Sequence, residues 1–185
     1  MSFMKYFIII GFFCLIACKH PDKKTQINTP KPSLSLDTSR YAILKFDKDS
    51  DQYVFGKNAK PATLFDADIV KIEDLISKRV SEYNRIEKDS AISITKRLRK
   101  KSHDPNFVWN GDFVKNPSEY YKQLIPINNS KGEKEVWVNC FCDTSEKSYW
   151  KKSIVMVNDG GSCFFQLKIN LTKNIVYNFF VNGVA

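Results

Sequence analysis

Residues 163–181 read CFFQLKINLTKNIVYNFFV, and this stretch decides the fold. In residues 163–171, every second side chain is apolar and the intervening side chains are mostly polar. A period of two is typical of a β-strand with one buried face. Residues 172–174, TKN, supply a turn, and residues 175–181 form the returning strand. The stretch therefore predicts an antiparallel hairpin that closes one side of a sheet.

Two earlier segments show the same alternation. Residues 135–142, EVWVNCFC, form one predicted strand, and residues 120–127 form another. The turn between them is residues 128–132, NNSKG. Pro126 has no backbone N–H to donate, so it marks the first of these strands as an edge strand or a bulged one.

A further strand is predicted at residues 150–157, between these two segments and residue 163. Residues 158–161, NDGG, follow it and supply the positive φ angles of a tight hairpin turn. Short turns between alternating strands indicate an antiparallel meander with one face covered.

The clearest helix lies before these strands in the chain. Its apolar positions recur every three or four residues on one face: Ile69, Ile72, Leu75, Ile76, Val80 and Tyr83. Asp66 is predicted to cap its start, and Asn84 to end it in a left-handed conformation. The predicted fold class is α+β, with one long amphipathic helix packed on a curled antiparallel sheet. By analogy of shape this is similar to cystatin-like and nuclear-transport-factor-like folds, which implies no function.

The segment between the helix and the sheet, residues 86–118, has little periodicity, and we expect it to be the most mobile part of the domain. Residues 96–101, KRLRKK, hold five basic side chains in six positions. The structural interpretation is a solvated loop or helix end. The functional interpretation is attraction to anionic headgroups or to an acidic glycan.

Ordered structure is predicted to begin at residue 41 with a short strand over residues 41–46. Residues 47–51 contain three aspartates and form a turn, after which residues 52–55 return as the hairpin partner.

Three cysteines lie in the predicted sheet: Cys140, Cys142 and Cys163. A strand at residues 150–157 would separate Cys142 from Cys163 by two strand spacings, or about 9.6 Å. A disulfide needs Cα atoms within about 7 Å, so buried free thiols are favoured over a bond to Cys163. A different strand order would permit that bond. A zinc or redox site using these three cysteines and His103 is the remaining alternative.

The other face of the predicted strands carries a candidate binding surface. Trp137, Phe141, Phe164 and Phe180 point away from the cysteine face. They alternate with polar side chains, namely Asn139, Lys168 and Asn178. Mixed aromatic and amide character suits a surface that binds a sugar or a protein. The alternative interpretation is that this face is simply the core beneath the helix.

The N-terminus has the organisation of an export signal. One positive charge at Lys5 precedes an apolar run at residues 6–13, which is too short to span a bilayer as a permanent helix. The following tetrad LIAC, residues 15–18, resembles the lipobox of bacterial lipoproteins. The resemblance implies cleavage before Cys18 and acylation of that cysteine. Several acyl chains on one residue give stable anchoring, because each buried CH₂ contributes about 0.8 kcal/mol.

The predicted organisation is a signal peptide at residues 1–17, a lipidated cysteine and flexible tether at residues 18–40, and a single domain at residues 41–185. The tether is polar, contains three prolines and has no apolar periodicity. Lys19 is not the acidic residue typical of inner-membrane retention, so we expect an outer-membrane destination.

The formal charge is +9, and the leader contributes only the charge of Lys5, which leaves +8 on the mature chain. On a membrane-anchored protein, excess lysine is typical of a solvated surface close to anionic lipid. Nucleic acid is not an expected partner of an exported protein. No motif for a cofactor is present, and none is expected.

Several short motifs resemble a group of small uncharacterised lipoproteins of the Bacteroidota: YKQ (121–123), GEKEVWVNCFC (132–142), WKK (150–152), DGGSCFF (159–165), KINL (168–171) and VNGVA (181–185). The resemblance covers residues 121–185 and the helix end at Tyr83 and Asn84. It implies a shared sheet and a membrane address, and it implies no activity or site residues.

The sequence thus predicts a lipid-anchored, non-enzymatic module of the bacterial cell envelope that binds a protein or glycan partner or serves as an accessory component. The alternative is a thiol- or zinc-dependent catalytic or redox protein that uses Cys140, Cys142 and Cys163.

Overall fold

The structure is a computed structural model that describes residues 38–51, 54–144 and 148–183. The described residues belong to one compact unit, Leu34–Ala185. The predicted leader, Cys18 and nearly all of the predicted tether lie outside the described residues.

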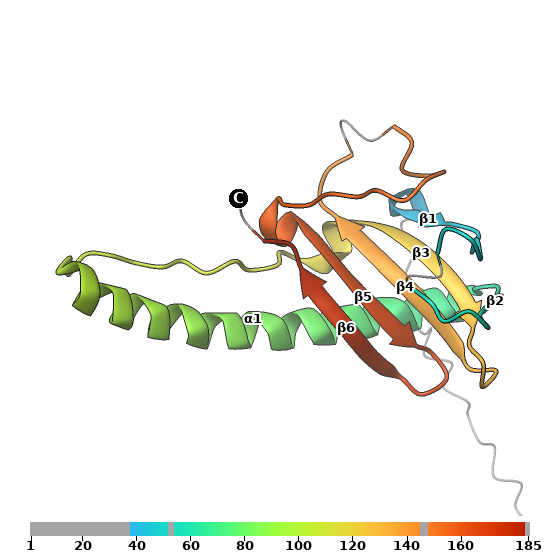
Figure 1. The fold of residues 1–185 in the computed structure, drawn as a ribbon, viewed down its shortest axis with the longest axis horizontal. Coiled ribbons are helices and arrows are strands. Elements are labelled where there is room, and N and C mark those ends of the chain that lie inside the picture. The colour runs from blue at the N-terminus through green and yellow to red at the C-terminus, as the bar shows by residue number, and fades with distance from the viewer. Residues whose placement is uncertain (1–37, 52–53, 145–147, 184–185) are drawn as a thin grey trace, which may run out of the picture. The chain divides into compact units, whose positions relative to one another are not determined.

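A mixed sheet forms the centre of the fold, with strands in the order β1-β3-β4-β5-β6 (Figure 1). Its main strands are the meander β3 (Tyr121–Asn128), β4 (Lys134–Phe141), β5 (Phe164–Asn170) and β6 (Ile175–Val181). The short strand β1 (Tyr41–Ile43) pairs with β3 in parallel, and β2 (Lys60–Pro61) pairs with the end of β3. The strands of the meander that flank the turns at residues 128–132 and 172–174 are as predicted.

Helix α1 (Asp66–Ser102) covers one face of this sheet with its first half. Ile72, Ile76 and Val80 are buried there against alternate residues of β3, β4 and β5, among them Leu124 and Val138. The α+β class and the amphipathic helix on the sheet are confirmed. The predicted cap is wrong by one position: Phe65 precedes the first turn, and its N–H donates to the Asp68 carboxylate at 3.0 Å.

The second half of α1 continues for 18 residues beyond Asn84, so the predicted end of the helix is wrong. The helix ends at Ser102, and the capping residue His103 has the left-handed conformation, with a φ of 59°, that Asn84 was expected to adopt. Residues 104–107 form a turn, and residues 108–116 then run back along the helix without regular secondary structure, past the limit of the sheet (Figure 1). We call α1 from Asn84 onward, together with residues 104–116, the arm.

The other face of the sheet carries a second core. Trp137, Phe141 and Ile125 are buried there beneath residues 44–46, 54–55 and 150–157. The prediction that residues 150–157 form a strand is wrong, because they cross this face as an irregular segment. Likewise, residues 54–55 belong to turns and do not pair with β1, whose partner is β3.

Two buried amides hold the irregular segment in place. The Gln123 side-chain oxygen accepts from the Val155 N–H at 2.8 Å, and the Asn139 amide donates to the Val155 carbonyl at 2.8 Å. The Asn139 amide also donates to the Gln123 oxygen at 3.0 Å. These side chains therefore provide the hydrogen bonds that a neighbouring strand would otherwise provide.

Because residues 150–157 are not a strand, β4 and β5 are direct neighbours, with Phe141 opposite Phe164. The next pair outward is Cys142 and Cys163, whose Cα atoms are 5.1 Å apart and whose sulfurs form a disulfide. The expectation of three free thiols is thus corrected. That expectation assumed a strand between Cys142 and Cys163, and residues 150–157 do not form one. Among the cysteines of the described residues, only Cys140 is free.

Candidate functional site

The arm is held together by helix side chains that bond to the backbone of the returning segment. Asn84 both donates to the Val114 carbonyl, at 2.8 Å, and accepts from the Val114 N–H, at 3.0 Å. The Thr95 hydroxyl accepts from the Trp109 N–H at 2.9 Å, and Arg99 donates to the Phe107 carbonyl at 2.7 Å. These bonds pair four backbone groups of a segment that has no neighbouring strand.

These contacts lie on one stripe of the helix. Asn84, Glu87, Ala91, Thr95 and Arg99 are separated by three or four residues and therefore share a face. Ala91, in the middle of this stripe, is buried, with 7% of its surface exposed. Sequence periodicity missed this stripe because most of its members are polar.

Beside the stripe lies an open groove of about 520 Å³ between α1 and the returning segment. Its apolar lining is Ala91, Ile92, Val108 and Trp109. Three of these side chains are well exposed: Ile92 by 62%, Val108 by 56% and Trp109 by 46%. Exposed apolar side chains gathered in one groove are typical of an interaction site.

The rim of the groove is basic. Lys88, Lys96 and Arg99 line it, and no acidic side chain does. The helix carries no acidic residue between Asp89 and its C-terminal end, whereas residues 96–101 hold five basic ones. Part of this charge has a structural role, because cations at a helix C-terminus interact favourably with the helix dipole. The sequence analysis did not identify this groove. The i+4 spacing of Lys88, Ile92 and Lys96 was the available signal, because it places these three side chains on one face of a helix.

The predicted aromatic surface does not exist as one surface. Trp137 is 5% exposed and Phe141 is fully buried, because the irregular segment covers them. Phe164 is half-buried, and Phe180, on the edge strand β6, is 61% exposed. The idea that this face lies beneath the helix is also wrong, since the helix packs on the cysteine-bearing face.

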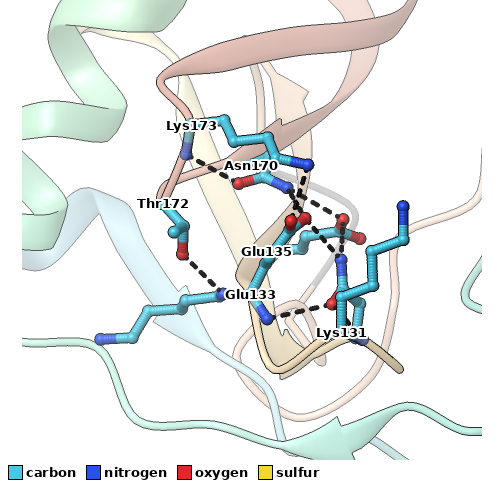
Figure 2. Close-up of polar contacts among 8 residues, drawn as sticks. Lys131, Glu133, Glu135, Asn170, Thr172 and Lys173 are labelled. Atoms are coloured by element: carbon cyan, nitrogen blue, oxygen red, sulfur yellow. Dashed lines mark hydrogen bonds and ion pairs between the residues drawn. The ribbon is translucent and has the colours of Figure 1, made fainter.

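A polar cluster joins the two hairpin turns at one end of the sheet (Figure 2). The amide of Asn170 donates to Glu133 at 2.8 Å, and the amide of Asn129 donates to Glu135 at 2.7 Å. Lys173 pairs with Glu133 at 2.6 Å. The Lys173 ammonium and the two amides lower the pKa of Glu133 to about 2. Each carboxylate has its donors within the protein, so the cluster acts as a clamp between turns.

A second ionic cluster lies between α1 and the sheet. The Lys122 ammonium is 1% exposed, lies 3.2 Å from the Glu73 carboxylate and donates to the Tyr120 carbonyl at 3.1 Å. The Tyr41 hydroxyl also donates to Glu73. A buried cation requires such partners, and this set fixes β1 and β3 against the helix.

The free thiol of Cys140 is fully buried on the helix-covered face, and burial raises its pKa above the usual value. A nucleophilic thiol needs a lowered pKa and access to solvent. Over the described ranges, no three His, Cys, Asp or Glu side chains come together in a way that could hold a metal ion. The sulfurs of Cys142 and Cys163, which the zinc alternative required as ligands, are joined to each other.

Within residues 38–51, 54–144 and 148–183, no helix has the length and apolar character needed to cross a membrane. No family model, curated protein or solved structure matches this chain.

Proposed function

We propose that this protein is a lipid-anchored, non-enzymatic module of the bacterial cell envelope that engages its partner through the groove of the arm. The observation that carries the binding role is the groove itself, in which exposed Ile92, Val108 and Trp109 lie inside a basic rim. Burying such side chains against a partner is favourable by about 25 cal/mol per Å² of apolar surface.

Two further features support the envelope location. The Cys142–Cys163 disulfide is typical of proteins in oxidising compartments such as the bacterial periplasm or cell surface. The LIAC tetrad at residues 15–18 resembles a lipobox, which makes Cys18 the proposed site of acylation. Both features agree with the resemblance to small lipoproteins of the Bacteroidota, with the outer membrane as the proposed destination.

Anchoring is tested by growing cells that express the full chain with a labelled fatty acid. The proposal expects label in the wild-type protein and none in Cys18→Ser, which should also accumulate with its leader attached. Equal labelling of the two chains would contradict the anchoring proposal.

Binding is tested by placing a photoreactive phenylalanine analogue at position 109 of the full chain and irradiating intact cells. The matched control is position 156, because Met156 is 74% exposed but lies outside the groove. The proposal expects a crosslinked product, with protein or with lipid, from position 109 and much less from position 156. Equal yields at the two positions would contradict a role for the groove.

A further inference from the structure

We infer that the groove of the arm docks onto an anionic phospholipid surface, with Ile92, Val108 and Trp109 entering the headgroup layer and Lys88, Lys96 and Arg99 contacting lipid phosphates. This inference rests on the proposed function, because it names the partner of the same groove. It goes beyond acylation, since it assigns a second, reversible membrane contact to the folded domain.

The apolar side chains are of the types that enter a membrane interface. Trp109 supplies an amphipathic ring, which favours the headgroup level. Ile92 on the helix and Val108 on the returning segment lie with it in the same groove, so that three side chains from two elements enter together. Interfacial elements of this kind bury apolar side chains about 5–10 Å deep while their basic residues remain among the headgroups.

Two backbone groups beside the apolar side chains already have partners within the arm. The Trp109 N–H donates to the Thr95 hydroxyl, and the Phe107 carbonyl accepts from Arg99. An unsatisfied backbone group moved out of water costs several kcal/mol. Because these groups are paired within the arm, shallow insertion of Val108 and Trp109 leaves them satisfied.

The charge pattern favours an anionic ligand, such as the phosphates of a lipid surface. Three cations line the groove without an acidic residue among them, and residues 96–101 extend the positive surface toward the end of the helix. A basic residue near an anionic membrane contributes about 1 kcal/mol, or roughly a fivefold change in binding. Long lysine and arginine side chains can also cover apolar surface while their charged ends reach the headgroups.

A membrane fits this groove better than a folded protein partner does. A stable protein interface buries about 800 Å² on each partner around a central apolar cluster. Here only three well-exposed apolar side chains are present, with cations around them. Figure 1 shows that the arm extends past the sheet, and every residue that lines the groove belongs to the arm.

The test uses the fluorescence of the full chain reconstituted into vesicles whose phospholipids carry brominated acyl chains. The protein has three tryptophans, of which Trp137 and Trp150 are 5% and 7% exposed and only Trp109 is well exposed. Quenching that disappears in Trp109→Phe therefore reports the depth of the arm alone. The lipid anchor is the same in every sample.

We expect Trp109 to be quenched in vesicles of phosphatidylethanolamine with about one third phosphatidylglycerol, and not in vesicles of phosphatidylcholine. Lys88→Gln/Lys96→Gln should lower the ratio of docked to undocked arm about 25-fold. The matched control Lys48→Gln/Lys60→Gln removes the same charge from exposed residues outside the groove and should leave the ratio unchanged. Circular dichroism of each variant checks that the fold is intact.

The inference is overturned if Trp109 remains accessible to aqueous iodide and unquenched in the anionic vesicles. It is also overturned if the wild type in neutral vesicles, or the lysine variant in anionic vesicles, is quenched as much as the wild type in anionic vesicles. Protection of Trp109 only after addition of an acidic envelope protein would assign the groove to a protein. Failure of acylation at Cys18 or of the crosslink at position 109 is measured separately, so failure of the proposed function is distinguishable from failure of the membrane inference.

Discussion

The side-chain amide of Asn84 takes both backbone groups of Val114, donating to its carbonyl at 2.8 Å and accepting from its N–H at 3.0 Å. The two residues are 30 positions apart in the chain. The Asn84 side chain thus provides the two hydrogen bonds that a neighbouring strand would otherwise provide, and it fixes the returning segment to the helix. Asn84 therefore begins the arm instead of ending the helix.

Asn84→Ala should loosen the base of the arm. It removes two hydrogen bonds and leaves the half-buried polar groups of Val114 without their partner, at a cost of about 1–3 kcal/mol. We expect amide hydrogen exchange at Val114 to accelerate by one to two orders of magnitude while amides of β4 keep their protection. Asn84→Asp keeps the acceptor and should restore most of the protection of the Val114 N–H. Unchanged exchange in the alanine variant would contradict this role.

Ala91→Leu should separate the returning segment from the helix. Ala91 is 7% exposed and lines the groove together with Val108 and Trp109, and overpacking at such a position costs about 1–3 kcal/mol. The measurement is the rate of limited proteolysis within residues 104–110, which should rise several-fold. Ile92→Leu changes the adjacent, exposed position and should leave the rate within experimental error. Equal rates for the two variants would show that the segment does not pack on Ala91.

The Cys142–Cys163 disulfide should stabilise the domain measurably. Opening a closed loop with a sequence separation of 21 costs about 2–4 kcal/mol. In urea unfolding, Cys142→Ala/Cys163→Ala should show this loss, and reductant should shift the wild type to about the same midpoint. Reductant should not shift the double variant. If the wild type is also insensitive to reductant, the predicted stabilisation is absent.

The free thiol of Cys140 should react only after unfolding, because it is fully buried and burial raises its pKa. Alkylation with iodoacetamide at neutral pH, followed by mass spectrometry, should leave Cys140 unmodified in native protein and modify it in urea. Rapid modification of the native protein would revive the catalytic or redox alternative.

The clamp between the hairpin turns should make the stability of the domain depend on pH in the acidic range. The pKa of Glu133 is lowered from 4.5 to about 2 in the folded protein by Lys173, Asn129 and Asn170. The ionised form is therefore favoured by folding. Its contribution is fully present above pH 4.5 and is lost as the pH falls through about 2.

Unfolding by urea at pH 6, 3 and 2 checks this dependence. Glu133→Gln should show a smaller fall in stability between pH 6 and pH 2 than the wild type does. Glu119→Gln, at an exposed residue outside the clamp, should follow the wild-type curve. Identical curves for wild type and Glu133→Gln would show that this carboxylate does not carry the dependence.

The aromatic side chains of the predicted binding surface should differ in their contribution to stability, because some of them are buried and others are exposed. Trp137→Ala should cost about 3–5 kcal/mol of stability, because the ring is buried beneath the irregular segment. Phe180→Ala should change stability by less than about 1 kcal/mol, because that ring is 61% exposed. Thermal or urea unfolding measures both. Similar losses for the two variants would contradict the different burial of these side chains.

Most of the sheet and the first half of the helix could be predicted, because alternation and the three-to-four spacing are local consequences of backbone geometry. Cys140, Leu167 and Ile169 were placed on one face of the sheet by period alone, and the structure buries them together. The candidate site could not be predicted in the same way. Val108 and Trp109 lie in a segment without any period, and only their contact with α1 brings them beside Ile92.

Residues 150–157 show where local pattern fails. Their apolar side chains predicted a strand. To form the hydrogen bonds of a strand in the predicted meander, these residues would have to lie in the sheet between β4 and β5. The buried amides of Gln123 and Asn139 bind the Val155 backbone from above the sheet instead. That single difference makes β4 and β5 neighbours, joins Cys142 to Cys163 and buries Trp137.

The sequence by itself determined the periods of the elements: strands that alternate, a helix with one apolar face, and turns at residues 128–132 and 172–174. These follow from the covalent backbone and from which side chains avoid water. The tertiary structure alone decided which strands are neighbours, which cysteines pair and where α1 ends. Such contacts join residues 21 to 100 positions apart, as Cys142 joins Cys163, Asn84 joins Val114 and Lys71 joins Leu171, and no local pattern records them.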